Sequence, residues 1–171
     1  MPRPRAFRVP GGMPAAASVL LVSALLASAC GGSADAQKVL QVTDLTTGWY
    51  DAGIVNGKNK LVPTVSFRVK NVGPSTVKYV QLNAVFRVIG DQEELGSMFV
   101  KGIGGDGLAP GAYTETYVLR SALGYTGEQP RHEMLEHSSF RDAKVEIFAK
   151  PGSAQWVRLT EHTVARQLLT R

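Results

Sequence analysis

The residues best suited to metal chemistry form the stretch HEMLEH at residues 132–137. Zinc proteases place two histidines one helical turn apart, with a glutamate acting on the metal-bound water. His132 and His137 are five residues apart, so a helix would point them to different faces. A third ligand would have to come from His162, and nothing in the sequence brings it near. The spacing predicts a solvated surface turn, and we expect no metal and no cofactor.

Glycine and serine provide the next candidates for chemistry. Residues 102–107 are glycine-rich, but a phosphate-binding loop precedes a substantial helix, whereas here a proline turn and a strand are predicted to follow. Asp106 alone does not supply the several oxygen ligands of a calcium site. The serines near the histidines lack the G-x-S-x-G motif of a nucleophile elbow. We therefore predict that the chain is not an enzyme, and ligand contact by the loop at 102–107 stays open.

Cys30 is the only cysteine in the chain, and it follows the pattern of an export signal. Three arginines in the first eight residues precede an apolar run at residues 15–26, which is the order of a secretory signal peptide. The run is too short to cross a bilayer as a helix, which takes about 20 residues. The stretch LLASACGGS at residues 25–33 resembles the bacterial lipobox, in which small residues precede an obligatory cysteine. The resemblance implies a diacylglyceryl group on Cys30, cleavage before it, and acyl chains such as palmitate.

The lipobox resemblance has a rival, because Ala27-Ser28-Ala29 also fits the small-x-small rule of ordinary signal peptidase, as does Ala34-Asp35-Ala36 further on, before Gln37. Cleavage by that enzyme would release a soluble protein. In the lipoprotein interpretation, residues 1–29 form a helical signal peptide and residues 30–38 a lipidated flexible tether. Gly31 is not the aspartate linked with inner-membrane retention, which implies the outer membrane, facing the periplasm. Residues 39–171 then form the folded domain.

The basic charge of the chain comes mostly from the export signal. The formal net charge is +5, but residues 30–171 carry 16 Lys and Arg against 14 Asp and Glu, a net charge of +2. The remaining charges are interspersed and form no cluster of the kind that a phosphate backbone requires. We therefore expect no nucleic-acid partner.

Alternating apolar and polar residues predict that the domain consists of strands. Val65, Phe67 and Val69 alternate with polar residues, and the pattern resumes in a long strand at residues 77–89. Turns rich in Gly, Pro and Asn separate these strands from others near 39–50, 95–101, 112–119, 143–150 and 155–159. This pattern predicts an all-β, immunoglobulin-like or fibronectin-like sandwich of about seven strands. Residues 130–137 are predicted to form a helical turn or two that begins with proline.

The strands and turns of residues 61–120 resemble a known type of envelope module. VSFRVKNVGPSTVKYVQLNAVFRVIGDQEELGS, followed by GLAPG, is similar to the immunoglobulin-like FxLYD or CARDB-like modules of bacterial envelope lipoproteins. The resemblance implies a binding or scaffolding module without catalytic residues.

Aromatic residues beside predicted turns supply the candidate contact surface: Trp49, Tyr50 and Tyr125. Such side chains combine a large apolar area with a polar group and are enriched at interfaces. The leading hypothesis is a membrane-anchored, non-catalytic interaction or scaffolding module that binds an envelope protein. A carbohydrate- or lipid-binding module using these aromatics is the alternative, and a hydrolase with a site assembled from distant residues is the third hypothesis.

Overall fold

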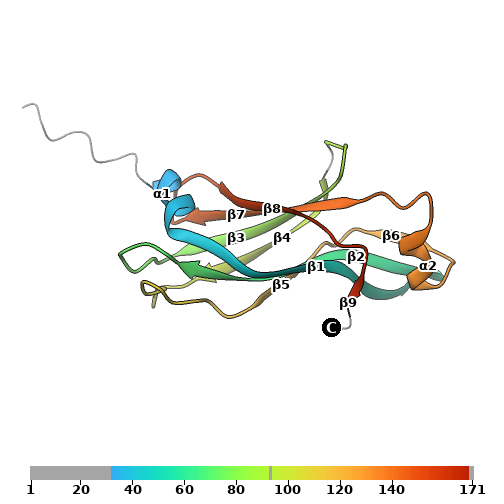
Figure 1. Ribbon diagram of the computed structural model, residues 1–171, viewed down its shortest axis with the longest axis horizontal. Coiled ribbons are helices and arrows are strands. Elements are labelled where there is room, and N and C mark those ends of the chain that lie inside the picture. The colour runs from blue at the N-terminus through green and yellow to red at the C-terminus, as the bar shows by residue number, and fades with distance from the viewer. Residues whose placement is uncertain (1–31, 93, 170–171) are drawn as a thin grey trace, which may run out of the picture. The chain divides into compact units, whose positions relative to one another are not determined.

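Most of the chain is β-strand, as the alternating pattern predicts. The computed structural model describes residues 32–92 and 94–169, so the predicted signal peptide and Cys30 lie outside the described residues (Figure 1). The elements are α1 (Gly32–Val39), β1 (Leu40–Val55), β2 (Lys58–Asn71), β3 (Val80–Val88), β4 (Glu94–Ile103), β5 (Tyr117–Arg120), β6 (Tyr125–Gly127), α2 (Arg131–Glu136), β7 (Ala143–Pro151), β8 (Val157–Thr163) and β9 (Leu168–Leu169). Within that part of the chain, neither helix has the length and apolar character to span a membrane.

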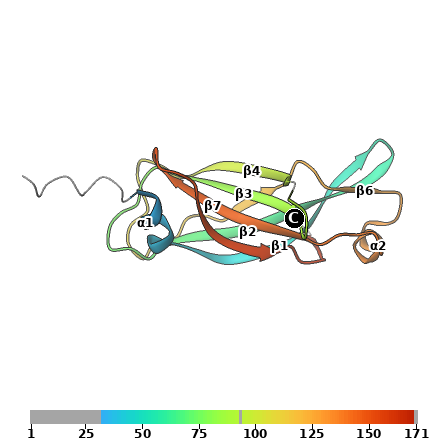
Figure 2. The same cartoon turned by 90° about the horizontal axis from the view of Figure 1, so that it is seen from above.

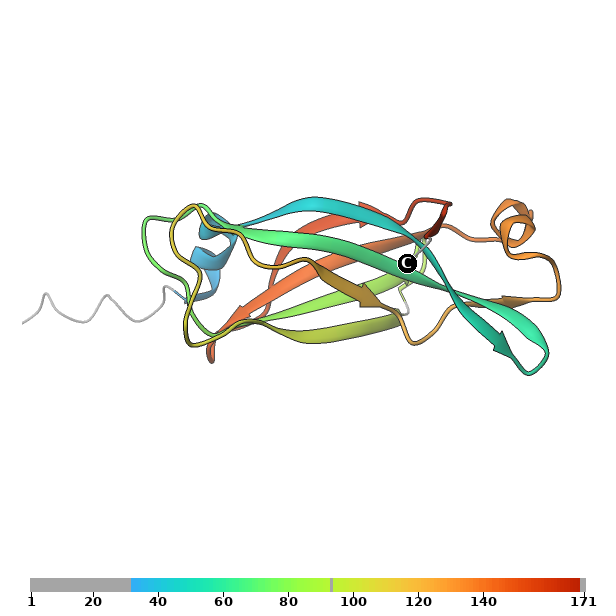
Figure 3. The same ribbon diagram turned by 90° about the horizontal axis from the view of Figure 1, so that it is seen from below.

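A long hairpin of β1 and β2 dominates the first sheet. Asn56 and Gly57 connect the two strands, both with positive φ (51° and 77°), as a tight type I′ turn requires. The strand order is β5-β2-β1-β9. β6 pairs with the same edge of β2 as β5 does, nearer the hairpin turn. Figure 3 shows the hairpin tip reaching past the sheets on the side where α2 lies.

The second sheet is antiparallel, with the order β4-β3-β7-β8 (Figure 2). Side chains hold the edge strands of this sheet to the rest of the domain. Tyr117 Oη donates to the carbonyl of Gly102 in β4 at 2.6 Å, and Thr47 Oγ1 donates to the carbonyl of Thr163 in β8 at 3.1 Å. The two sheets are thus linked along both sides of the layered core.

The core lies between the sheets and uses the residues that the alternation predicted. Apolar side chains at every second position of the three central strands are fully buried, namely Val65, Phe67, Val69, Leu82, Ala84, Phe86, Val145, Ile147 and Ala149. Burying such side chains is worth about 1.5–3 kcal/mol each for the larger ones, which explains why the period-two pattern selects this arrangement. The all-β, two-sheet prediction is confirmed, with nine strands in the described residues instead of about seven.

The predicted flexible tether at residues 30–38 is wrong for most of its length, because α1 occupies Gly32–Val39. Ala36 is buried in the core, and Gln37 Nε2 donates to the carbonyl of Arg158 at 2.7 Å. Small residues alone indicated a linker, but Ala36 is small enough to pack closely against the end of the second sheet.

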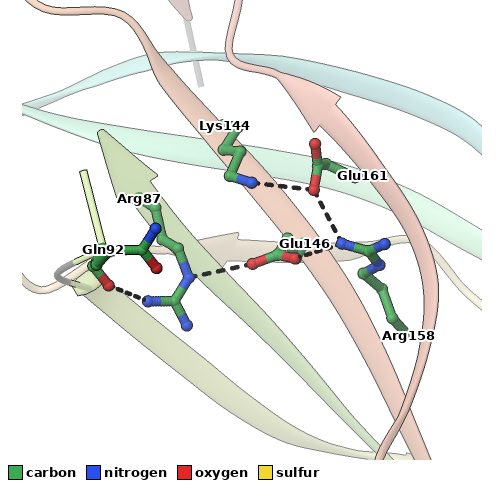
Figure 4. A network of polar contacts seen from close by, with 6 residues as sticks. All are labelled: Arg87, Gln92, Lys144, Glu146, Arg158 and Glu161. Atoms are coloured by element: carbon green, nitrogen blue, oxygen red, sulfur yellow. Dashed lines mark hydrogen bonds and ion pairs between the residues drawn. The ribbon is translucent and has the colours of Figure 1, made fainter. Parts of the chain in front are cut away.

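Glu146 of β7 organises an ionic network on the outer face of the second sheet (Figure 4). Its carboxylate accepts from Arg158 at 2.7 Å and from Arg87 at 3.1 Å. Glu161 accepts from both Arg158 and Lys144. Burial alone would raise the pKa of Glu146, but the hydrogen bonds from Arg158 and Arg87, together with the positive charges of Lys144 and Arg158, hold the pKa below its usual range.

Candidate functional site

Several of the residues that the sequence singled out gather near α2, namely His132, His137, Trp49 and Tyr125. Pro130 precedes α2 as its N-cap residue, and its extended backbone (φ −52°, ψ 145°) starts the short helix as predicted. Met134 and Leu135 are buried, while His132 and Glu133 face solvent. The helix therefore presents a polar face to solvent and an apolar face to the domain.

Three polar contacts tie the segment before and within α2 to the β1–β2 hairpin. Arg131 Nε lies 2.6 Å from Asp51 Oδ2, and this ion pair lowers the pKa of Asp51. Asn59 Nδ2 donates to the carbonyl of Gln129 at 2.9 Å, and Lys58 pairs with Glu128 at 3.4 Å. The hairpin tip and α2 are thereby held together, and we call residues 51–59 and 125–140 the α2 end.

An aromatic cluster forms the floor of the α2 end. Ring centroids lie 5.4 Å apart for Trp49 and Tyr125, 4.8 Å for Trp49 and Phe140, and 4.7 Å for Tyr125 and Phe140. Arg166 lies over the Phe140 ring at 5.1 Å. Pairs at these distances are worth about 0.5–1.5 kcal/mol beyond the area they bury. The cluster is a rigid support for whatever binds above it.

The predicted contact surface needs correction, because Trp49 is fully buried. Tyr50 is half-buried beneath the Arg120 guanidinium, 3.8 Å from its ring centroid. Tyr125 is half-buried, its Oη donates to the carbonyl of Arg141 at 3.0 Å, and burial raises its pKa. Sequence position beside a turn did not reveal burial, since the long hairpin carries Trp49 into the middle of β1. Trp49 is therefore not available for contact, whereas Tyr50 and Tyr125 each keep a partly exposed ring.

Two open hollows flank α2. The first, of about 150 Å³, has Tyr125 and Phe140 in its lining together with Met134 and the polar groups of His137 and Ser139. The second, of about 480 Å³, lies between α2 and the segment before and within β9, and is lined by His132, Leu135, Glu136, Arg166, Gln167 and Leu168. The guanidinium of Arg166 already donates to Asp142 and to two backbone carbonyls, which leaves it little capacity for a ligand.

The histidines do not form a metal site. In residues 32–92 and 94–169, no group of three or more His, Cys, Asp or Glu side chains could hold a metal ion. His162 lies on β8 and contacts Thr160 Oγ1 at 2.9 Å. His137 Nδ1 accepts from the backbone N–H of Ser139 at 3.2 Å and lies 2.7 Å from its Oγ. His137 and Ser139 thus contact each other within a local turn.

Two exposed residues at the α2 end were not predicted from the sequence. Ile54 is 70% exposed and Val55 40% exposed, next to the Asn56-Gly57 turn. The Asn-Gly pair between apolar stretches is the strongest short-range signal for a hairpin, and it would have placed both side chains at a tip. Away from this end, Phe99 and Trp156 pack edge to face on the second sheet, and both are also exposed.

The glycine-rich loop at residues 102–107 lies at the opposite end of the domain, beside the β3 entrance. The backbone N–H of Tyr79 donates to the carbonyl of Gly104 at 3.2 Å, and Val77 and Leu108 form a bridge. The loop is therefore ordered by β-type pairing with the segment before β3.

Sequence comparison assigns no family to this chain: no protein-family model matches it, and no functionally curated protein matches it. The chain is similar to the X-ray structure of structural genomics target SoR45 (12% identity, TM-score 0.41, covering 76% of this chain and 89% of that chain). A Bordetella pertussis protein provisionally named ApaA is similar at 17% identity and TM-score 0.40, over 74% of this chain and 93% of that chain. The solution structure of AT1g01470 from Arabidopsis thaliana is similar at 12% identity and TM-score 0.41, over 78% and 83%. Similarities this low assign no function.

Proposed function

We propose that this chain is an exported, lipid-anchored envelope protein whose immunoglobulin-like sandwich acts as a non-catalytic interaction module. Acyl chains on Cys30 hold it to a membrane, with the outer membrane and the periplasm as its expected location. An envelope protein docks at the α2 end. The observation that carries this docking site is the exposed apolar hairpin tip. Polar contacts hold the tip to the segment before and within α2, and this same segment helps to line the hollow above the aromatic cluster.

The hollow over the aromatic cluster favours a protein side chain over a small molecule, whereas the second hollow beside α2, of about 480 Å³, falls within the range of small-molecule pockets. Pockets for drug-sized ligands usually enclose about 300–1,000 Å³, and the hollow over Tyr125 and Phe140 is about half the lower bound. That volume suits one apolar side chain of a partner. Ile54, which is 70% exposed, would be buried on docking, and full burial of such a side chain stabilises a complex by up to about 1.5–3 kcal/mol before ordering costs.

The docking site is tested with a photo-reactive phenylalanine analogue at position 55 in cells that express the full chain. We expect a cross-linked partner, and Ile54→Asp to reduce its recovery at least tenfold, because a carboxylate cannot be buried in an apolar contact. Val118→Asp is the matched control, since Val118 is an exposed β-branched residue of β5. Equal loss with both variants, or no cross-linked protein, would reject docking at the α2 end.

The membrane anchor is tested separately by mass spectrometry of the mature N-terminus. We expect a chain that begins at acylated Cys30, since two or more acyl chains make a stable anchor. An unmodified chain that begins at Cys30 or Gln37 would show export of a soluble protein and reject the anchor. The docking experiment is independent of this outcome.

A further inference from the structure

The end of the sandwich opposite α2 carries an unusual set of unpaired lysines. The chain has eight lysines. Five of them lie at this end, in α1 or beside the turns at 72–79, 104–116 and 152–156, namely Lys38, Lys70, Lys78, Lys101 and Lys150. Within residues 32–92 and 94–169, none of these five forms an ion pair, whereas Lys58 and Lys144 each pair with a glutamate. We call these five residues the lysine end, which lies at the side of α1 in Figures 1 and 2.

The strand register places two of these lysines in one row. Lys101 and Lys150 both pair with Gln81, so their side chains share the outer face of the second sheet on either side of it. Lys150 Nζ lies 6.0 Å from the Trp156 ring centroid, over an aromatic surface that does not neutralise its charge. Among residues 36–92 and 94–169, the exposed carboxylates nearby are Asp106 and Glu115, while Asp44 is already paired with Arg68. The lysine end therefore has a positive surface.

Three aromatic side chains stand exposed on this positive end, namely Tyr79, Tyr113 and Trp156, and Tyr113 lies beside Lys70. Tyr79 is 62% exposed although its backbone has a positive φ of 55°, which is rare for a bulky residue. Backbone hydrogen bonds with Gly104 and Gly152 hold it there, and its ring lies against Gly105. Trp156 is 39% exposed. The backbone thus keeps a tyrosine ring at the surface at a conformational cost.

An anionic bilayer surface is bound by lysine side chains together with exposed Tyr and Trp. Ammonium groups attract acidic headgroups, and the amphipathic rings sit at the headgroup level. Cys30 lies two residues before α1, so extended chain spans at most about 7 Å between them. A lipid on Cys30 would hold this end within about one Debye length of the membrane. We propose that the lysine end docks on the surface of an anionic phospholipid bilayer.

This inference rests on the proposed anchor only for orientation, because binding itself requires no acyl chain. Among the residues that the structure describes, the buried core extends from Ala36 to Val164, so residues 31–171 serve as the test protein, with folding checked by circular dichroism. Vesicles of phosphatidylcholine with and without 30% phosphatidylglycerol are the probes. We expect co-sedimentation with the anionic vesicles only, and quenching of tryptophan fluorescence by brominated lipid. Buried Trp49 cannot reach the lipid, so the quenching reports Trp156 and is absent in Trp156→Phe.

Lysine variants locate the binding surface. The triple variant Lys78→Gln, Lys101→Gln, Lys150→Gln should lower the vesicle partition coefficient by roughly 100-fold, at about fivefold per lysine. The matched triple Lys58→Gln, Lys60→Gln, Lys144→Gln makes the same change of net charge in the three remaining lysines and should change the partition coefficient far less. Equal losses in the two triples, no binding to anionic vesicles, or equal binding to neutral vesicles would overturn the proposal. Because the test protein lacks Cys30, these outcomes are separate from the result of the N-terminal mass spectrometry.

Discussion

Arg131 and Asp51 form a 2.6 Å ion pair that joins the start of α2 to the long β1–β2 hairpin. A six-residue helix is too short to be stable alone, since helices under about 12–15 residues are marginal in water. Its position therefore depends on this pair, on its buried Met134 and Leu135, and on the neighbouring contacts of Asn59 and Lys58. These contacts therefore determine how firmly the proposed docking site is held in place.

Replacement of Arg131 by Met should raise the pKa of Asp51 towards its ordinary value, because the close contact with Arg131 is the main cause of the lowered pKa. NMR titration of the Asp51 carboxyl measures this change. Both side chains are partly exposed, so the loss of unfolding free energy should be below about 1 kcal/mol. Lys58→Met, which removes the nearby pair with Glu128, should leave the pKa of Asp51 unchanged. An unaltered Asp51 pKa in Arg131→Met would contradict the pairing.

Glu146→Gln should destabilise the domain by about 1–3 kcal/mol at pH 7, because one nearly buried carboxylate serves two arginines. The lowered folded pKa of Glu146 means that its contribution is complete above the unfolded value of about 4.5. The contribution is lost as the pH falls through the folded pKa. Urea unfolding of both proteins from pH 7 to pH 2 should therefore show a stability difference that shrinks below about pH 4.5.

Glu161→Gln provides the control for this network. Its carboxylate is 40% exposed and shares Arg158 with Glu146, so its removal should cost less than about 1 kcal/mol. A larger loss in Glu161→Gln than in Glu146→Gln would show that Glu146 is not the centre of the network.

Trp49→Ala should cost about 3–5 kcal/mol of unfolding free energy, because the side chain is fully buried and its loss leaves a cavity beneath Tyr125 and Phe140. Trp156→Ala should cost less than about 1 kcal/mol, since that side chain is partly exposed on the second sheet. Thermal and urea unfolding measure both. Similar effects for the two tryptophans would contradict the assignment of Trp49 to the core.

Gly124→Ala should destabilise the domain by about 1–3 kcal/mol, because a Cβ at this position would lie 2.0 Å from the backbone oxygen of Leu61. The added methyl group would push the segment entering β6 away from β2. Gly104→Ala is the matched control in the glycine-rich loop, where a Cβ would meet no atom within 4 Å. Its effect should stay within about 0.5 kcal/mol. Urea unfolding distinguishes the two, and a neutral Gly124→Ala would show that β6 can move without loss.

Local patterns were sufficient to predict most of the strands. Phe67, Leu82 and Phe86 are buried where period-two alternation placed them, and Pro130 begins a short helix as expected. The N-terminal half of β2 was not predicted, because residues 61–65 are buried continuously and lack alternation. The strand predicted at 112–119 forms only at its end, since Tyr113 makes an isolated bridge and lies between the cations of Arg68 and Lys70.

The amino-acid sequence by itself determined the all-β class, the central core positions and the failure of the histidine spacing to make a zinc motif, because each depends on neighbours a few residues apart. Only the tertiary structure decided which aromatic residues are available for contact. From the sequence, Trp49 and Trp156 both lie near predicted turns or strand ends. Trp49 is nevertheless in the core and Trp156 at the surface, since pairing between distant strands sets burial. The same long-range pairing brought Asp51 to Arg131, and aligned Lys101 with Lys150 across Gln81.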